Sequence, residues 1–311
     1  MPSSSSIKHL TRTQIDTTRW NDCIEQANNE SPYARADYLD ALCPGWEALV
    51  QGDYQLVMPL PVKRKFGIRY LYQPTLVPHL GVYGKSIDSE QLISFLQSIP
   101  KNIRWIDATL NPSNRVEHPD FPIRMRTNYI LSLVDEYDTL RSRYRENHRR
   151  NLQRAQKAGC TVNTTIDVRE IFQLVQNYVI PRPSLSDSTK KSFLLLMENW
   201  MQSGRAQTYG VRVNGTLQAG ALFLLDRNRA YYLLAGNHPN GKTLGASHAL
   251  IDAFIQANAG TDRILDFEGS DLPSLAFFYA GFGSKTEPYA WLQWNRLPWW
   301  VRWIKSGSAS M

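Results

Sequence analysis

Three consecutive β-rich runs between residues 206 and 236 constrain the fold of this chain more than any other feature. The runs AQTYGVRVNG, LQAGALFLLD and RAYYLLAG are joined by short turns, so they are expected to form antiparallel neighbours. A glycine-containing loop, the helix SHALIDAFIQANAG, the strand RILDFEG and the helix LPSLAFFYAGFG follow them. This order predicts an α+β fold with mixed, mostly antiparallel sheets flanked by helices, and not a doubly wound parallel sheet.

The first part of the chain has a separate pattern of helices and strands. Helices are predicted over 17–30, 33–43 and 88–99, a hairpin over 48–62, a basic turn over 63–67 and a strand over 103–110. A loop rich in proline and asparagine comes next, and the β pattern restarts near residue 128. We therefore predict an N-terminal domain over 1–127, a C-terminal domain over 128–290, and a segment 291–311 that packs on the first.

An arginine-rich segment lies near the middle of the chain. Residues 136–159 are predicted to form one helix that Gly159 closes. At helical spacing, one stripe of this helix is mostly apolar and consists of Tyr144, His148, Leu152 and Ala155. A second stripe is cationic and consists of Arg143, Arg150, Arg154 and Lys157. The cationic stripe is interpreted as a solvated face, as a nucleic-acid contact, or as a site for an acidic small molecule. The segment has no aromatic residue besides Tyr144, which disfavours nucleic acid.

Charge and cysteine content limit the classes of partner and the compartment. The 35 Lys and Arg residues exceed the 28 Asp and Glu residues by seven, which favours anionic partners without predicting nucleic-acid binding. Cys23, Cys43 and Cys160 have no paired spacing and are expected to be free thiols in a reducing compartment. With no apolar signal region at the start of the sequence and no long apolar run, we expect a cytoplasmic protein.

The run LPWWVRWIKS groups Trp299, Trp300 and Trp303 with Arg302 and Lys305. Aromatic and basic residues together are typical of a bilayer interface or of a contact with a second subunit. We therefore consider a peripheral contact with the inner face of the membrane, beside the simpler interpretation that this terminal segment packs on its own protein.

A P-loop pattern, GNHPNGKT, spans Gly236 to Thr243 between a predicted strand and a predicted helix. A nucleotide hydrolase is therefore one alternative function. The residues after Thr243 are too few for the several parallel βα units of such a domain, and Pro239 removes one backbone N–H from the loop.

Several stretches, in this order, resemble the GNAT acyltransferase fold, and the whole chain resembles the Fem-type proteins that carry two such folds in tandem. MPLPVKRKFGIRYLYQP and LGVYG resemble the first domain, and HRRNLQRAQKAG, LGASHALIDAFIQ and LDFEGSDLPSLAFFYAGFG resemble the second. The resemblance implies acyl or aminoacyl transfer to an amine, with acyl-CoA or aminoacyl-tRNA as a co-substrate that is not tightly bound. It also implies a small anionic acceptor such as a cell-envelope precursor. A member of the fold without catalytic activity is a further alternative, because fold alone does not give function.

The resemblance also implies where the donor binds. The loop GKTLGAS corresponds in part to the pyrophosphate loop of GNAT enzymes, with Lys242 where the family has Gln or Arg. Gly241, Lys242, Gly245, Ala246 and Ser247 are the predicted donor-binding residues, since glycines admit close backbone approach and a helix N-terminus attracts anions. A connecting loop with a helix cap is the alternative interpretation.

The predicted catalytic groups are two carboxylates and a tyrosine. Tyr279 lies in FFYAGFG, where many GNAT enzymes have an acid for the leaving group; a residue in an aromatic core stripe is the alternative. Asp266 and Glu268 are two residues apart, so on a strand both would lie on one face, and two close carboxylates raise one pKa toward that of a base. Capping and hydrogen bonding to loop amides are the alternative roles.

Acceptor-binding residues are predicted on both domains. Arg150, Arg154 and Lys157 from the arginine-rich segment, with Lys63 and Asp107 from the first domain, are the candidates to contact an anionic substrate. The histidines show no spacing to other ligand residues that would predict a metal site, and no stable protein partner is implied.

Overall fold

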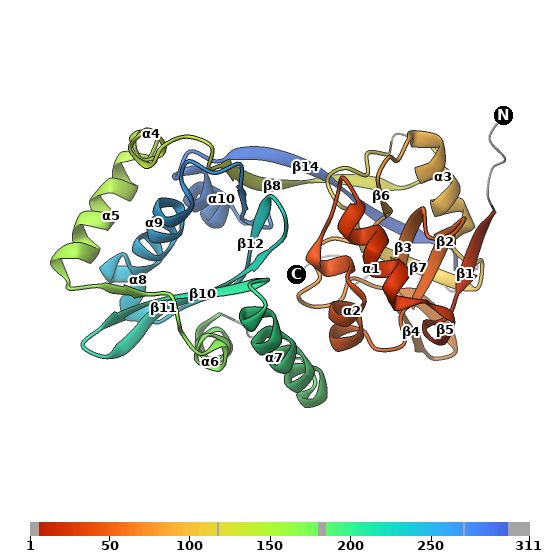
Figure 1. Cartoon of the computed structure of the whole chain (residues 1–311), viewed down its shortest axis with the longest axis horizontal. Helices are drawn as coiled ribbons and strands as arrows, with labels where there is room; N and C mark the ends of the chain where they lie inside the picture. Colours follow the sequence, from red (N-terminus) through yellow and green to blue (C-terminus); the bar gives the residue numbers. More distant parts are fainter. Residues whose placement is uncertain (1–5, 117, 180–184, 270, 298–311) are drawn as a thin grey trace. The chain divides into compact units, whose positions relative to one another are not determined.

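Two long strands, β8 (Ile123–Ser132) and β14 (Lys285–Asn295), carry the chain between two units of the computed structural model (Figure 1). The structure describes residues 6–116, 118–179, 185–269 and 271–297. The first unit takes in the described residues up to Arg126 and those from Pro288 onward, and the second is Thr127–Glu287. Trp299, Trp300 and Trp303, for which a membrane contact is predicted, lie outside the described residues.

One sheet of the first unit has the strand order β1-β2-β3-β6. Its strands, β1 (Ile7–Leu10), β2 (Glu47–Gln51), β3 (Leu56–Leu60) and β6 (Tyr83–Gly84), are antiparallel to their neighbours. Helices α1 (Thr17–Gln26) and α2 (Ala36–Leu42) supply its core, where Trp20 packs edge-on against Trp46 with ring centroids 4.7 Å apart. Helix α1 begins where the Asp16 side chain accepts hydrogen bonds from the first amides of the helix.

A second group of strands in this unit begins with a basic hairpin. Strands β4 (Val62–Lys65) and β5 (Ile68–Leu71) are antiparallel, β5 runs parallel to β7 (Ile103–Thr109), and β7 pairs with β14. Helix α3 (Ser89–Ser98) precedes β7 and starts with a capping box of Asp88 and Gln91. The predicted turn over 63–67 is wrong in extent, because Phe66 and Gly67 alone close the hairpin with φ of +50° and +77°.

The second unit contains the strand order β8-β13-β12-β11-β10-β9. The remaining strands are β9 (Thr161–Asn163), β10 (Ala206–Val213), β11 (Thr216–Leu225), β12 (Arg229–Asn237) and β13 (Ile264–Asp266). Its helices are α4 (Tyr137–Ser142), α5 (Glu146–Lys157), α6 (Val168–Tyr178), α7 (Asp187–Gln202), α8 (Pro239–Leu244), α9 (Ala246–Asn258) and α10 (Pro273–Ala280). Only β12 and β13 are parallel here, so the predicted α+β class with mixed, mostly antiparallel sheets is confirmed.

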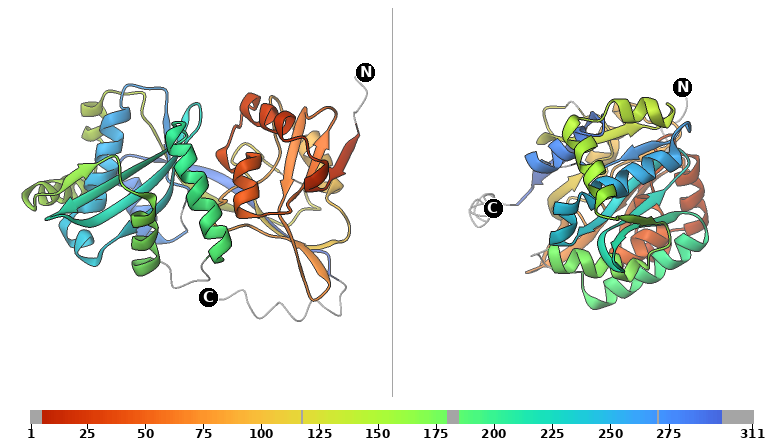
Figure 2. Two further views of the ribbon diagram at one scale, coloured as in Figure 1. Left: turned by 60° about the horizontal axis from the view of Figure 1, so that its bottom comes forward. Right: turned by 90° about the vertical axis from the view of Figure 1, so that its left-hand side faces the viewer.

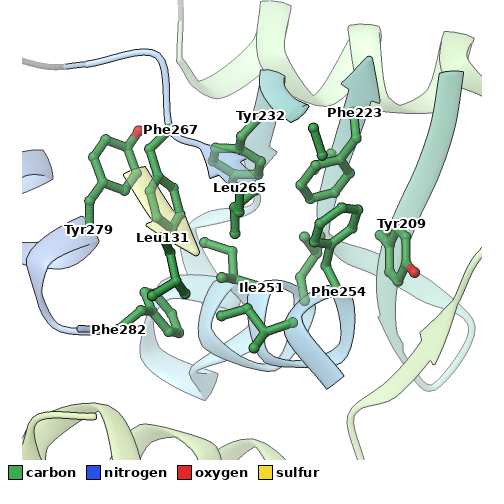
Figure 3. Close-up of a cluster of buried hydrophobic side chains, with 14 of the residues drawn as sticks. Leu131, Tyr209, Phe223, Tyr232, Ile251, Phe254, Leu265, Phe267, Tyr279 and Phe282 are labelled. Atoms are coloured by element: carbon green, nitrogen blue, oxygen red, sulfur yellow. The ribbon is translucent and has the colours of Figure 1, made fainter. Parts of the chain in front are cut away.

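Helix α9 covers one face of this sheet with an aromatic core. Phe254 of α9 stacks on Phe223 of β11 at 4.0 Å between ring centroids, and Tyr209 of β10 lies against both rings (Figure 3). Burial of these large rings is the main favourable contribution to packing here. The opposite ends of the cluster in Figure 3 are formed by Tyr209 and Tyr279.

Helix α6 packs on the other face through a row of glycines. Gly210, Gly220 and Gly236 are register partners on three adjacent strands, and alternation places them opposite to the face that Tyr209 uses. A Cβ at Gly236 would lie 2.8 Å from the backbone nitrogen of Val175 in α6. The absence of side chains along this row therefore lets the helix lie directly on the strands (Figure 2).

The arginine-rich segment forms two helices, which corrects the prediction of a single helix over 136–159. The chain leaves α4 after Ser142 and begins α5 at Glu146. Between them Tyr144 is buried, and the Arg145 amide donates to the carbonyl oxygen of Gly281 at 2.9 Å instead of to a helical carbonyl. Tertiary contacts thus override the helical periodicity at this point.

Candidate active site

The parallel strands β12 and β13 pair over three residues and then separate. Arg229, Ala230 and Tyr231 pair with Ile264, Leu265 and Asp266, whereas β12 continues to Asn237 with register partners only on β11 among the described strands. We call the end of this pairing, after Tyr231 and Asp266, the strand fork. Ligands of α/β sheets commonly bind beyond the carboxyl ends of parallel strands, so the fork is a natural place for a site.

A β-bulge lies directly beside the strand fork. Phe223 pairs with Tyr232 and Leu222 pairs with Leu234, so Leu233 is an extra residue on β12 without a register partner. Bulges re-aim backbone groups and often occur next to active sites. Sequence reasoning missed this feature, because no residue in LLAG distinguishes a bulged strand from a regular one.

Glu268 follows the end of β13 and has an unusual backbone and an unpartnered oxygen. Its φ is +60°, and its amide donates to Asp266 Oδ1 at 2.7 Å. The residue is half-buried, but its Oε1 is buried and has no hydrogen-bond partner among the described residues. Burial raises the pKa of this carboxyl well above its usual range. A strained, desolvated carboxyl of this kind is more typical of a functional group than of a structural one.

Tyr279 packs against Phe267, the residue that precedes Glu268 in the chain. Its ring stacks on Phe267 at 4.7 Å and approaches Tyr232 at 6.4 Å, and the residue is 7% exposed (Figure 3). Burial, with the carboxylate of Glu268 as the second cause, raises the pKa of Tyr279 above its ordinary value. The structure therefore brings together two of the three predicted catalytic residues, in a setting where each affects the charge of the other.

Asp266, the third predicted catalytic residue, is held in a buried network of hydrogen bonds and an ion pair. Strand β13 ends at Asp266, so the prediction that Asp266 and Glu268 share one face of a strand is wrong. Asp266 is fully buried, accepts hydrogen bonds from Arg229 and Asn128 at 2.9 Å, and lies beside Glu287, which Arg229 also contacts. Both of its carboxylate oxygens are occupied, which leaves no acceptor for a substrate proton.

The predicted donor loop is a short helix followed by a helix start. Gly241 and Lys242 lie in α8, where a Cβ at Gly241 would meet the carbonyl oxygen of Gln218 at 2.2 Å. Gly245 has φ +79° and separates α8 from α9, and its position opposite Asn151 leaves no room for a side chain. Close packing against neighbouring backbone thus requires glycine at both positions, which the sequence pattern does not reveal.

The same geometry opposes the P-loop alternative. The amides of Gly241 and Lys242 donate to the carbonyl oxygen of His238, and the Asn240 amide donates to His238 Nδ1. These N–H groups are therefore engaged within α8 and do not form a phosphate cradle. The strands that precede the loop are antiparallel, unlike the parallel sheet that a P-loop domain requires.

Helix α9 begins without a side-chain cap. Its N-cap is Gly245, so no side chain hydrogen-bonds the first amides of the helix, and Ala246 at its first position is buried. Ser247 instead donates to Asn237 Oδ1 at the end of β12. The start of α9 therefore retains the partial positive charge that attracts anions.

The predicted cations of α5 differ in their surroundings. Arg154 donates to the carbonyl oxygen of Thr243 at 3.3 Å, which places its guanidinium at the junction of α8 and α9. Arg150 forms an ion pair with Glu146, at 3.7 Å on an exposed surface, and Lys157 is exposed. Of the three, Arg154 alone is held next to the predicted donor residues; Lys242 is exposed on α8.

Lys63 and Asp107 belong to the first unit and have local contacts there. Lys63 Nζ lies 4.2 Å from the ring centroid of Tyr72, and Asp107 Oδ1 accepts a hydrogen bond from Trp291 Nε1 at 2.7 Å. Their predicted role in acceptor binding stays a prediction. In the described ranges no group of three His, Cys, Asp or Glu residues is arranged to hold a metal ion. Nor does any helix in this part of the chain combine the length and apolar character needed to cross a bilayer.

Comparisons with known proteins agree with this architecture. Residues 142–273 match the family model for the GNAT acetyltransferase domain. The crystal structure of FemX is similar with a TM-score of 0.61 and 12% identity, over 92% of this chain and 97% of that one. The C-terminal domain of a putative lysylphosphatidylglycerol synthetase from Agrobacterium fabrum is similar with a TM-score of 0.54 and 11% identity, over 91% of this chain and 92% of that one. A tandem GNAT protein from the clavulanic acid biosynthesis pathway is similar with a TM-score of 0.51 and 11% identity, over 94% of this chain and 99% of that one.

No curated protein matches the chain significantly. The family match to residues 142–273 and the shared fold place this protein in the class of GNAT-fold proteins. Within that class it has the Fem-like arrangement of tandem GNAT-like domains, as the resemblance of the sequence implied.

Proposed function

We propose that the protein transfers an acyl or aminoacyl group from a CoA thioester or a tRNA ester to an amine of an anionic acceptor, and that the reaction takes place at the strand fork. The observation that carries the proposal is the pair of Glu268 and Tyr279. Glu268 has a buried Oε1 without a hydrogen-bond partner in the described residues, and Tyr279 is a phenol whose pKa is raised by burial and, as a second cause, by Glu268; they are the base and the acid that such a transfer needs.

The proposed steps balance in atoms and charge. Glu268 takes a proton from the acceptor ammonium group, whose freed amine attacks the carbonyl carbon of the donor. The oxyanion that forms would accept a hydrogen bond from a backbone N–H at the bulge, where Leu233 has no register partner on β11. When the tetrahedral intermediate collapses, the bond to sulfur or to the tRNA oxygen breaks and Tyr279 protonates the leaving group. The attacking nitrogen loses its second proton to bulk water, and the proton on Glu268 restores the phenol, so the amide, the thiol or hydroxyl, and one proton leave.

The donor is proposed to bind with its phosphates at the start of α9. The uncapped amides there, the guanidinium of Arg154 and the exposed ammonium of Lys242 attract anionic groups. GNAT domains in general use acyl-CoA, which makes acyl-CoA the first donor to test, and aminoacyl-tRNA the second. The neighbours FemX and lysylphosphatidylglycerol synthetase support an acceptor from the cell envelope.

A transfer assay with radiolabelled acetyl-CoA, longer acyl-CoAs and aminoacyl-tRNA, each offered with amine acceptors, tests the proposal. Tyr279→Phe and Glu268→Gln should each lower kcat by about 10²-fold or more, because each removes one proton-transfer group. Tyr209→Phe is the matched control, since Tyr209 is another buried tyrosine of the same core. Full activity in both site variants, or no transfer by the wild type with any donor, would contradict the proposal.

A further inference from the structure

The hairpin of β4 and β5 ends in an exposed aromatic ring. Phe66 at its tip is 92% exposed, and the orange hairpin extends away from the other strands of its own unit in the left view of Figure 2. The backbone φ of +50° at Phe66 is unfavourable for an aromatic residue, whereas asparagine and glycine accept it readily. The sequence thus keeps a large apolar side chain where neither packing nor turn geometry favours one.

Cations follow immediately behind this ring. Lys63, Arg64 and Lys65 are exposed and form no ion pair among the described residues, and Arg64 lies directly opposite Arg69 in the register. Arg69 is paired with Glu47, so the uncompensated charge belongs to β4. Like charges directly opposite one another are unfavourable in a hairpin, and Arg64 has only a hydrogen bond to the Gly67 carbonyl oxygen as a polar contact among the described residues. The charge pattern fits an anionic partner.

From these observations we infer that the β4–β5 hairpin binds the surface of an anionic lipid bilayer, a role separate from the transfer reaction. At about 3.3 Å per strand residue, the three cations lie within about 10 Å of the tip. Peripheral elements insert apolar groups about 5–10 Å into the boundary between headgroups and acyl chains. The Phe66 ring can therefore enter this boundary while the cations remain at the level of the lipid phosphates.

Single-stranded RNA is the other polyanion that contacts aromatic and basic residues. RNA sites of this type combine stacking platforms with a charged groove that follows the backbone of the strand. In the hairpin the Phe66 ring lies at the turn beside Gly67, with Lys65 Nζ 5.5 Å from its centroid. This order, apolar at the tip and cationic behind it, matches the layers of a bilayer better than the path of a nucleic acid.

Co-sedimentation of the full chain with vesicles tests the inference. We expect vesicles of phosphatidylcholine with phosphatidylglycerol to bind the protein at least tenfold more tightly than phosphatidylcholine alone, with weaker binding at high salt. Phe66→Asn should reduce this binding at least fivefold. Because Asn-Gly favours this turn, the variant keeps the hairpin, and thermal unfolding verifies that the protein is folded. Met125→Ser removes another exposed apolar side chain of the same unit and should leave binding unchanged.

The charge is tested in the same way. The triple variant Lys63→Gln, Arg64→Gln and Lys65→Gln should lose most of the preference for anionic vesicles, whereas Lys8→Gln, Lys85→Gln and Lys101→Gln remove three other exposed cations and should not. Unchanged vesicle binding in Phe66→Asn or in the hairpin triple variant overturns the inference, whether or not another segment binds lipid. The inference is also overturned if the hairpin variants lose affinity for a single-stranded RNA oligonucleotide, measured by fluorescence anisotropy, but keep their vesicle binding.

Discussion

His148 of α5 and Phe278 of α10 are joined by a hydrogen bond between His148 Nε2 and the Phe278 carbonyl oxygen, 2.8 Å apart. The bond ties the arginine-rich helix to the helix that carries Tyr279. His148 is fully buried, and a Cβ at Gly281 would lie 1.9 Å from its ring, so the histidine occupies a space that this glycine leaves open. The position of Tyr279 thus depends on α5 through a contact one residue away.

Replacement of His148 by phenylalanine should destabilise the protein. The variant keeps a ring but removes the donor, which leaves the Phe278 carbonyl oxygen without this partner. We expect the free energy of unfolding to fall by about 1–3 kcal/mol in urea titrations. Arg150→Gln, on the exposed side of the same helix, should change it by less than about 0.5 kcal/mol. Equal stabilities of the two variants would show that the hydrogen bond is unimportant.

The stability of the fold should decrease as pH falls from about 6.5 to about 4. Burial, with His148 and Arg154 as further causes, lowers the pKa of His248 to about 4. The unfolded chain, with a histidine pKa of about 6.5, binds more protons in this interval, so acid favours unfolding. Neutral His248 therefore contributes roughly 3 kcal/mol to the free energy of unfolding above about pH 6.5, and this contribution is lost as the pH approaches 4. In chemical denaturation at a series of pH values, His248→Gln should flatten this dependence; an unaltered slope would refute the assignment.

Much of the fold was predictable because it follows from local pattern. The runs that form β10, β11 and β12 alternate or are wholly apolar between strong turn signals, and Asp16 and Asp88 mark helix starts at which their side chains accept backbone hydrogen bonds. The interruption of the arginine-rich segment was not predictable, because it depends on a bond from the Arg145 amide to Gly281, distant in sequence.

The candidate site was predictable only in part, for the same reason. Tyr279 was identified through family resemblance and Glu268 through its spacing to Asp266, whereas the electrostatic influence of Glu268 on Tyr279 follows from tertiary packing. Sequence spacing suggested that Asp266 would act with Glu268, but Arg229 and Asn128 occupy its oxygens from strands far away in sequence. The bulge at Leu233 left no signal in the sequence, since it depends on register with β11.

The glycine row under α6 should respond to alanine in a graded way. At Gly236 a Cβ would lie 2.8 Å from the backbone nitrogen of Val175, which cannot move without the helix. At Gly220 the nearest atom is a side-chain carbon of Ile171 at 3.0 Å, which can adjust by a small rotation. We expect Gly236→Ala to destabilise by about 1–3 kcal/mol, and Gly220→Ala by clearly less. Thermal and urea unfolding of both variants measure the difference, and the reverse order would contradict this account of α6 packing.

The ion cluster beside the strand fork should be needed for stability. Arg229 is the only cation seen to contact Asp266 and Glu287 in the described residues, with N–O distances of 2.9 Å to each. Its loss leaves two buried or half-buried carboxylates without a counter-ion, so Arg229→Met should cost about 3–5 kcal/mol at pH 7. Because protonation of the carboxylates relieves the repulsion, the deficit of the variant should shrink in acid. A deficit that is independent of pH would argue against the unpaired carboxylates as its cause.

Arg154 and Arg150 make a matched pair for the proposed donor site. Both are exposed arginines of α5, one turn apart, yet only Arg154 contacts the α8–α9 junction, through the Thr243 carbonyl oxygen. If donor phosphates bind at the start of α9, Arg154→Gln should weaken binding of acetyl-CoA by about 3- to 30-fold, which corresponds to one charge-assisted hydrogen bond. Arg150→Gln should leave the affinity within a factor of two. Isothermal titration calorimetry with acetyl-CoA and with 3′-phosphoadenosine 5′-diphosphate, which lacks the acyl arm, distinguishes a phosphate contact from one to the pantetheine. Equal losses in both variants would indicate a diffuse effect of net charge on the helix, and no loss in either would move the donor site away from α5.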